Sequence, residues 1–183
     1  YNWWNNIIRI ASIDREKRIL TLAEDASYPN RPNDRYYVRN LFEELDAPGE
    51  WYLDARTWTL YFYPPTATAH PDVYAPTLEN VVDMTGASHI ILRGFTIECC
   101  EGTAVILREC SNCLIAANTV RNAGGRAEAG LAGIHLAGGR NNQAAGNDIH
   151  EVGSRGILIE GGDRETLAPG GNSADNNYIH HVG

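Results

Sequence analysis

The sequence predicts an all-β protein: a right-handed parallel β-helix of about four coils of 23 or more residues, preceded by an aromatic-rich region of antiparallel β-hairpins. Three observations predict it. The second part of the chain repeats itself at intervals of 23 to 30 residues, each repeat holds three short apolar runs, and the composition changes sharply near residue 79. A fixed period in this range is typical of a repeat architecture.

The repeat becomes visible when the sequence is shifted against itself. A shift of 23 residues places Val82 on Val105, and a further 29 place Val105 on Ile134. Another 23 residues lead from Ile134 to Ile157. A second aligned file contains Phe95, Asn118, Asn147 and Asn177. Stacked asparagine side chains hydrogen-bond one another along a stack of strands, so we predict an asparagine ladder at one corner of the coil.

Three apolar runs in each repeat predict three strands per coil. In the first repeat they occupy residues 82–84, 90–92 and 95–97. Runs this short alternate like strands and cannot form an amphipathic helix. No room remains for crossover helices, so equivalent strands must pair in parallel as the coils stack. Such crossovers are nearly always right-handed. Gly124, Gly153 and Gly183 end successive coils, where we expect left-handed backbone angles.

Composition divides the chain into a β-rich hairpin region, residues 1–79, and the coils, residues 80–183. All four Trp, eight of nine Tyr and seven of eight Pro precede the boundary, whereas 17 of 18 Gly follow it. Alternating residues predict one hairpin from 7–13 and 18–22 and another from 51–54 and 59–63. Residues 40–45 are the one expected short helix. Trp3, Trp4 and Trp58 either pack this region or offer a ring face to a sugar.

Charge and hydropathy exclude two classes of partner. The formal net charge of −8 argues against nucleic acid, which requires a basic face. No stretch approaches the roughly 20 apolar residues that span a bilayer, so no membrane partner is expected. The chain does not begin with Met and ends at the corner of a coil. We therefore expect a segment of a longer protein, with a C-terminal continuation of the same β-helix as its neighbour.

Cysteine and histidine residues raise the question of a metal. Cys113 aligns with the apolar Ile90, and Cys100 aligns with Ala123 and Val152. Free cysteines usually behave as small buried hydrophobes, so we predict no metal and no cofactor. One further file contains Glu98, Arg121, His150 and His180. Histidines one coil apart are possible metal ligands, although a solvated face is the more common role of such a file.

The candidate site lies on the outer face of the first strand of each coil. Two coils carry insertions, within residues 123–132 and 163–176, and repeat proteins place insertions on the binding face. Because alternate strand residues face opposite sides, His135, Arg108 and Glu160 should point outward. We predict Glu160 and Asp163 as catalytic carboxylates, since glycoside cleavage uses a pair of them. The predicted substrate-binding residues are His135, Arg164, Arg108 and Glu128. The alternative is that Asp163 and Arg164 pair to hold their own loop.

Several blocks of sequence resemble a known family. They read YYVRNL (36–41), PGEWYLD (48–54), TLYFYPP (59–65), GGDRETLAP (161–169) and NNYIH (176–180). In these blocks the chain is similar to bacterial right-handed parallel β-helix repeat proteins, which include glycoside hydrolases acting on xylose- and fucose-containing plant glycans. Their usual hairpin turn carries glycine where this chain has Trp58.

The resemblance implies a carbohydrate-active enzyme, foremost a glycoside hydrolase acting on a plant or microbial oligo- or polysaccharide outside the cell or in the periplasm. It also implies that the acting carboxylates lie in coils beyond residue 183. Two alternatives stay open. A non-catalytic glycan-binding or scaffold module would bind sugar without turnover, because repeat stacks are common recognition surfaces. A polysaccharide lyase would depend on Ca²⁺ and release an unsaturated product.

Overall fold

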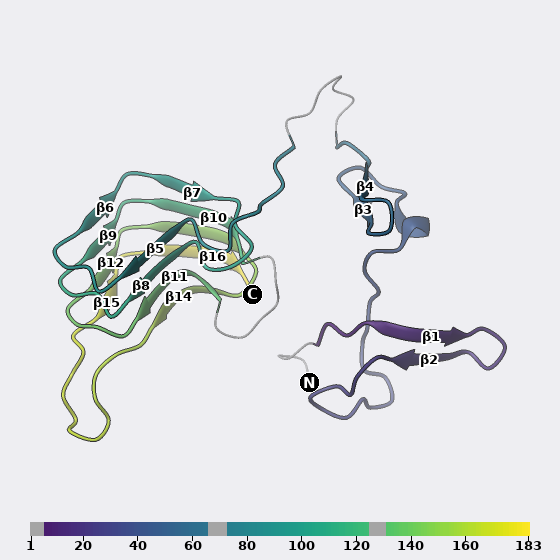
Figure 1. The fold of residues 1–183 in the computed structure, drawn as a ribbon, viewed down its shortest axis with the longest axis horizontal. Coiled ribbons are helices and arrows are strands. Elements are labelled where there is room, and N and C mark those ends of the chain that lie inside the picture. The colour runs from purple at the N-terminus through teal and green to yellow at the C-terminus, as the bar shows by residue number, and fades with distance from the viewer. Residues whose placement is uncertain (1–5, 66–72, 125–130) are drawn as a thin grey trace. The chain divides into compact units, whose positions relative to one another are not determined.

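The computed structural model describes residues 6–65, 73–124 and 131–183 and divides the chain into two compact units, Tyr1–Val73 and Tyr74–Gly183 (Figure 1). Strands make up most of the regular secondary structure in both units. The helical structure of the described residues is the short 3-10 turn η1 (Phe42–Glu44). None of these residues forms a helix long and apolar enough to cross a membrane.

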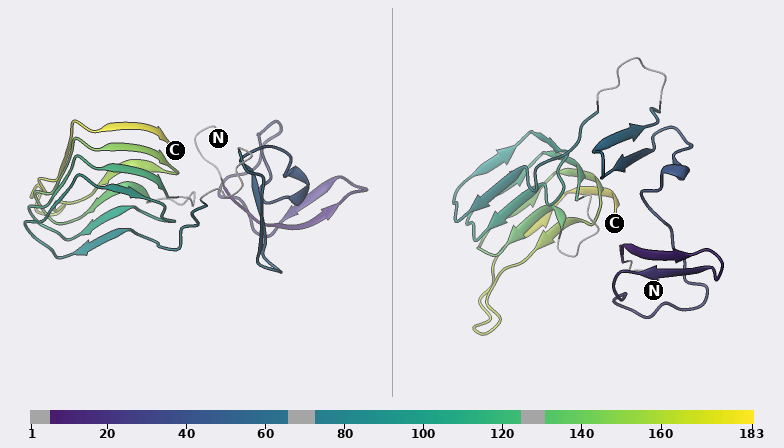
Figure 2. Two further views of the ribbon diagram at one scale, coloured as in Figure 1. Left: turned by 90° about the horizontal axis from the view of Figure 1, so that it is seen from above. Right: turned by 45° about the vertical axis from the view of Figure 1, so that its right-hand side comes forward.

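Three parallel four-stranded sheets form the second unit, and each coil contributes one strand to each sheet (Figures 1 and 2). The A sheet contains β5 (Val82–Thr85), β8 (Val105–Arg108), β11 (Ala132–Ala137) and β14 (Arg155–Ile159). The B sheet contains β6 (Ile91–Arg93), β9 (Leu114–Ala116), β12 (Gln143–Ala145) and β15 (Ser173–Asp175). The C sheet contains β7 (Thr96–Glu98), β10 (Thr119–Ala123), β13 (Asp148–Val152) and β16 (Tyr178–Val182). The unit is a right-handed parallel β-helix of four coils, as the repeat predicted.

The strand register reproduces the alignment of the repeats. Val105 pairs with Val82 on one side and with Ile134 on the other, and Ile134 pairs with Ile157. The second and third strands of the first coil begin one residue later than expected, at Ile91 and Thr96. The residues before them, Ile90 and Phe95, lie at the corners, where each carbonyl still accepts a backbone N–H from the next coil over 2.9 Å.

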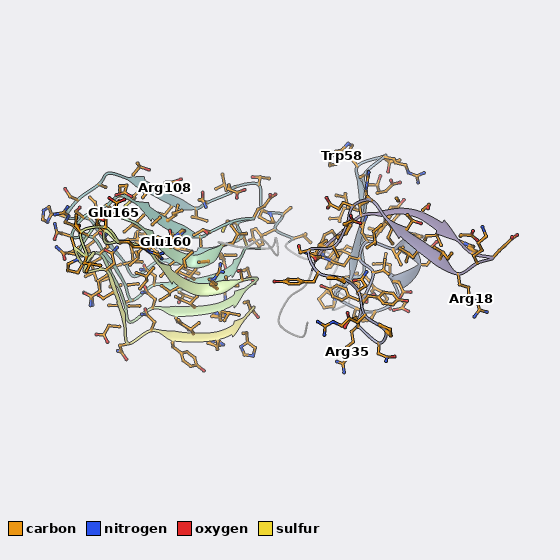
Figure 3. All side chains as sticks on the ribbon, turned by 90° about the horizontal axis from the view of Figure 1, so that it is seen from below. Arg18, Arg35, Trp58, Arg108, Glu160 and Glu165 are labelled. Carbon is orange, nitrogen blue, oxygen red and sulfur yellow. The ribbon has the colours of Figure 1, made fainter. Side chains whose placement is uncertain are left out.

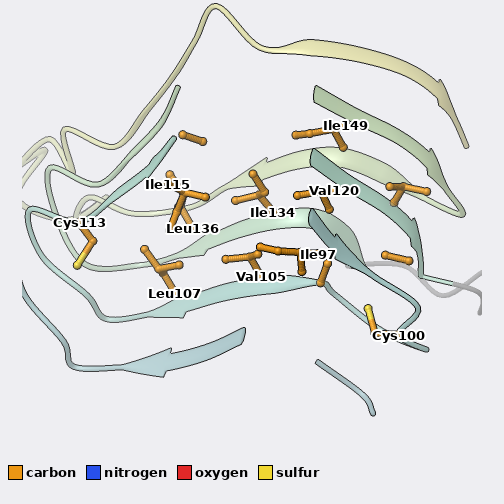
Figure 4. Close-up of a cluster of buried hydrophobic side chains, with 14 of the residues drawn as sticks. Ile97, Cys100, Val105, Leu107, Cys113, Ile115, Val120, Ile134, Leu136 and Ile149 are labelled. Atoms are coloured by element: carbon orange, nitrogen blue, oxygen red, sulfur yellow. The ribbon is translucent and has the colours of Figure 1, made fainter. Parts of the chain in front are cut away.

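Inward side chains of the middle coils form the core (Figure 4). Val105, Leu107, Ile134 and Leu136 of the A sheet are 0% exposed. They pack against fully buried residues of the other two sheets, among them Ile115, Val120 and Ile149. Burying one such side chain contributes about 1.5–3 kcal/mol. The apolar columns of the sequence are therefore what holds the coils together.

The predicted asparagine ladder is present at the corner between the B and C sheets. The backbone N–H of Asn118 donates to Oδ1 of Asn147 over 3.1 Å, and the N–H of Asn147 donates to Oδ1 of Asn177 over 3.0 Å. The side-chain amides follow the same path, at 3.1 and 2.9 Å. At the start of the ladder, the N–H of Phe95 donates to Oδ1 of Asn118 over 3.0 Å.

A second ladder, which the sequence analysis did not identify, lies at the corner between the A and B sheets. Here the N–H of Cys113 donates to Oδ1 of Asn142 over 3.1 Å, and the N–H of Asn142 donates to Oδ1 of Asn172 over 2.8 Å. Asn142 and Asn172 are 30 residues apart, as are Asn147 and Asn177. The shift that revealed the first ladder could therefore have revealed this one.

Left-handed residues turn the chain at each corner, but glycine is not always the residue used. Gly124 and Gly183 have φ of 68° and 111°, as expected, whereas Gly153 does not have a positive φ. In that coil Glu151 takes the left-handed conformation, with φ of 53°. Its stacked neighbours Asn122 and His181 both have φ of 50°. The expectation for Gly153 was therefore wrong: in that coil the left-handed Glu151 is not followed by a left-handed glycine, whereas Asn122 is followed by Gly124 and His181 by Gly183.

The first unit contains two antiparallel hairpins, β1 (Ile10–Asp14) with β2 (Ile19–Leu22) and β3 (Trp51–Asp54) with β4 (Thr59–Phe62). Trp58 has φ of 55°, so it takes the left-handed conformation that glycine adopts easily. The expected helix at 40–45 shortens to η1, whose Phe42 ring contacts Tyr52 and Tyr61 edge-on at 5.3 and 5.1 Å.

Candidate functional site

The outer face of the A sheet carries the residues that the strand alternation predicted. His135 pairs in register with Ile106 and Leu158, and the next outward row contains Thr85, Arg108, Ala137 and Glu160. Ile106 is 4% exposed, yet it does not belong to the buried core cluster. This agrees with a side chain that faces away from the coil interior.

His135 and Glu160 form the central contact of this face. Nε2 of His135 lies 3.0 Å from Oε2 of Glu160, and the two side chains are 13% and 60% exposed. The two atoms are within hydrogen-bonding distance, and the imidazole donates to the carboxylate in the tautomer that carries its proton on Nε2. The half-buried ring thus holds one oxygen of Glu160, while most of the carboxylate remains open to solvent.

The second asparagine ladder fixes the backbone of Glu160. The side-chain amide of Asn172 donates to the carbonyl oxygens of Glu160 and Gly138, both over 2.9 Å. The N–H of Glu160 donates to the carbonyl of Leu136 over 2.8 Å. Asn172 is therefore a positioning residue, and sequence reasoning missed it.

A shallow hollow lies directly beside Glu160. Glu160 and Arg164 line it, together with Asn172 and the backbone of the glycine pairs Gly161-Gly162 and Gly170-Gly171. These glycines begin and end the loop that connects β14 to β15, which Figure 1 shows extending away from the coils. A carboxylate, a guanidinium and exposed peptide groups are the groups that bind sugar hydroxyls. Figure 3 labels Arg108, Glu160 and Glu165 on this unit.

Arg108 is already engaged on this face. Its Nε lies 3.6 Å from Oδ1 of Asp83, and both side chains are about half exposed. Ala137 stands between Arg108 and Glu160 in the outward row. Coils rise about 4.8 Å each, so the Cα atoms of Arg108 and Glu160 are separated by about 10 Å. Because the side chain of Ala137 is only a methyl group, it fills little of the space between the side chains of Arg108 and Glu160.

Asp163 holds its own loop, although Arg164 is not the partner that the alternative interpretation named. Oδ1 of Asp163 accepts the N–H groups of Glu165 and Thr166 over 2.8 and 3.2 Å, and Asp163 pairs with Ala168 across the loop. The Thr166 hydroxyl, followed by the two backbone amides, lowers the pKa of Asp163. An ionised acceptor held in this way suits a loop anchor better than a proton donor.

We predict that Asp163 titrates below its ordinary pKa of 3.8. Because the folded pKa is depressed, its contribution to loop order is complete above 3.8 and is lost as the pH falls through the folded value. An NMR titration of the Asp163 carboxyl carbon measures this. Thr166→Val removes the hydroxyl and should move the midpoint upward. A midpoint at or above 3.8 in the unmodified chain would contradict the loop-anchor role.

The file of charged residues on the outer face of the C sheet forms contacts within itself. Nε of Arg121 lies 2.6 Å from Oε2 of Glu98, and the rings of His150 and His180 stack at 4.9 Å. Nε2 of His180 is 3.3 Å from Oδ1 of Asp148, without the alignment of a hydrogen bond. Over the described parts of the chain, no group of three or more His, Cys, Asp or Glu residues is arranged to hold a metal ion.

The four cysteines are free, and Cys100, Cys110 and Cys113 are buried. Burial raises the pKa of the Cys100 and Cys110 thiols. They pack as the aligned apolar columns indicated, which disfavours a reactive or metal-binding role.

Glu128, predicted to bind substrate from the first insertion, lies outside the described residues, and so do Trp3 and Trp4. Trp58 is 79% exposed, which leaves its ring face available for stacking.

Comparison with known proteins addresses the fold. A family model described as "Right handed beta helix region" matches residues 79–183. The match covers more than half of the chain, so the protein belongs to the right-handed β-helix family. No curated protein and no solved structure matches the chain.

Proposed function

We propose that this chain is part of a carbohydrate-active β-helix protein, a glycoside hydrolase, and that the outer face of the A sheet binds a neutral oligosaccharide. The observation that carries the proposal is the His135–Glu160 pair, joined over 3.0 Å beside the hollow that Arg164 also lines. The resemblance of the sequence blocks to plant-glycan hydrolases supports the substrate class.

The charge of the site favours a neutral glycan over an acidic polymer. Glu160 and Arg164 bring one charge of each sign to the hollow, Arg108 is paired with Asp83, and the chain carries a net charge of −8. An acidic polymer would be repelled by this field. It would also require a cation cluster, which a lyase uses to acidify the proton it removes.

Glu160 is the acid–base candidate of the proposal, and His135 orients it. A carboxylate held by one hydrogen bond keeps a second oxygen free for a glycosidic oxygen or a water molecule. Arg164 and the neighbouring glycine backbone would bind hydroxyl groups. A hydrolase needs a second carboxylate. Since Asp163 is engaged in its loop, Glu128 or a carboxylate outside this sequence would have to supply it.

A non-catalytic glycan-binding module is the second candidate. The specific observation in its favour is that Asp163 accepts two loop amides rather than facing Glu160 as a partner. The two candidates predict the same binding surface and differ only in turnover.

Changing Glu160 tests the shared binding surface. We expect Glu160→Gln to weaken binding of neutral xylose- or fucose-containing oligosaccharides about tenfold, a loss of about 1.4 kcal/mol, measured by calorimetry. Glu165→Gln, an exposed acid on the adjoining loop, is the matched control and should bind normally. If no neutral glycan binds, or if both variants bind equally well, the surface is misassigned.

Aryl glycosides then distinguish the two candidates. A hydrolase should release the aryl group, and Glu160→Gln should slow this by about a hundredfold or more, as expected for loss of a general acid–base group. Binding that persists without any turnover would favour the glycan-binding module.

A further inference from the structure

The outer face of the C sheet carries a second cluster of titratable side chains, which the candidate site does not use. It lies where β13 and β16 pair, and its members are Asp148, His150, Glu151, Tyr178, His180 and His181. The ring of His180 lies at its centre. It stacks on the ring of His150 at 4.9 Å, with 12° between the planes, and its centroid lies 4.5 Å from that of Tyr178. These contacts restrict where the two nitrogens of His180 point.

Asp148 supplies an acceptor that lacks a donor. Its Oδ1 is closed off from solvent and, among the described residues, has no hydrogen-bond partner. Nε2 of His180 lies 3.3 Å from this oxygen. A buried carboxylate oxygen is costly unless a donor reaches it. The χ2 torsion of histidine has a broad minimum, so a small rotation of the imidazole can align the two atoms. A proton on Nε2 of His180 is what the oxygen requires.

The other nitrogen of His180 meets a second imidazole. Its Nδ1 lies 2.6 Å from Nδ1 of His181. Two protonated nitrogens at this distance would repel each other, as would two lone pairs, so one proton lies between them. A neutral imidazole has one donor and one acceptor. With its own proton on Nε2, neutral His180 accepts at Nδ1, and the shared proton belongs to His181.

We infer that Asp148, His180 and His181 form a relay that leaves Nε2 of His181 as an exposed nucleophilic nitrogen, a site for acyl groups. A nucleophile is activated when a base within hydrogen-bond reach can take its proton and a third group orients that base. Here His180 is the base and Asp148 orients it. His181 is exposed, so its free nitrogen can meet a ligand. The relay is independent of the proposed function, because it lies on the C sheet and not on the A sheet.

The acyl transfer balances in atoms and electrons. The lone pair on Nε2 of His181 attacks the carbonyl carbon of an acyl donor, an anhydride or an aryl ester. A C–N bond forms, and the C–O bond to the leaving group breaks. The Nδ1 proton of His181 passes to Nδ1 of His180, which becomes an imidazolium beside the carboxylate of Asp148, and opposite charges this close favour the charged form. The leaving group then takes that proton, so His180 returns to its neutral state.

Nitrogen NMR of the histidine side chains tests the relay directly. At about pH 8, where imidazole is ordinarily neutral, we expect a pyrrole-type shift for Nε2 of His180 and a pyridine-type shift for Nε2 of His181. Asp148→Ala removes the acceptor and should leave both rings with mixed tautomers. Glu151→Gln is the matched control and should change neither ring, since Glu151 lies 3.5 Å from Nδ1 of His150 instead. A pyridine-type Nε2 on His180 in the unmodified chain would overturn the relay.

Diethyl pyrocarbonate, an anhydride that acylates imidazole, tests the site. We expect His181 to react about tenfold faster than His89, measured by tandem mass spectrometry. His89 is the matched comparison because it is also exposed, has φ of 59° and, within the described ranges, has no partner for its imidazole. His180→Phe keeps a ring to stack on His150 but removes both nitrogens, so the rate at His181 should fall to that of His89. Asp148→Ala should slow His181 as well. Equal rates at His181 and His89 in the unmodified chain, or an unchanged rate in both variants, would show the inference to be wrong.

Discussion

Asn147→Ala is expected to destabilise the coil unit by about 3 kcal/mol or more, because buried donors and acceptors left unpaired cost about 1–3 kcal/mol each. Asn147 is 1% exposed and sits in the middle of the first ladder. Its removal leaves the backbone and side-chain donors of Asn118 without their acceptor and the carbonyl of Ile115 without its donor. Urea unfolding, followed by far-ultraviolet circular dichroism, measures the loss.

Gln143→Ala is the matched control for this substitution. Gln143 carries an amide in the same coil, on β12, but it is half-buried and lies outside both ladders. Its loss should cost about 0.5 kcal/mol or less, as surface changes usually do. If the two variants unfold at the same urea concentration, the ladder does not hold the coils together.

Leu136→Ala is expected to cost about 3 kcal/mol, within the range found for buried leucine residues that leave a cavity. Leu136 is 0% exposed and belongs to the core cluster, between Leu107 and Ile159 in the file. Atoms stack against it from the coils on both sides, so the coil cannot collapse into the space without breaking its register. Chemical denaturation again provides the measurement.

Leu158→Ala, one coil later, is the control for Leu136→Ala. Leu158 pairs with His135 and faces outward, half-buried. Its truncation should cost about 1 kcal/mol or less. A larger loss at Leu158 than at Leu136 would mean that the assignment of inward and outward faces is reversed.

The sequence contained most of the fold because coil stacking repeats the same environment. Val105, Ile134 and Ile157 share one position in the coil, and each coil must fill it with an apolar side chain. The residues that take left-handed backbone angles at the corners were harder to predict from the sequence. At one corner Cys99, Asn122, Glu151 and His181 all adopt positive φ, and these four residue types share no chemical property that marks a turn. Local strain there is offset by the stacking on either side, so no glycine is required.

The candidate site was predictable only in part. Strand alternation placed His135 and Glu160 on the outer face, but their contact runs diagonally between coils and depends on side-chain rotamers. Asp163 was predicted to line a binding groove because the insertion that contains it was expected to border that groove. In the structure its Oδ1 accepts the backbone N–H groups of Glu165 and Thr166, two and three residues later. Aspartate often makes such turns, a local signal that competed with the catalytic interpretation.

Hydrogen-bond couplings measured by NMR test the stacked-coil account most directly. The structure places the N–H of Asp148 2.9 Å from the carbonyl of Asn118, and the N–H of Tyr178 2.8 Å from the carbonyl of Asn147. Scalar couplings across these bonds should link each amide to the carbonyl one coil earlier, in parallel register. Couplings that instead join neighbouring strands in antiparallel order would contradict the β-helix and everything built on it.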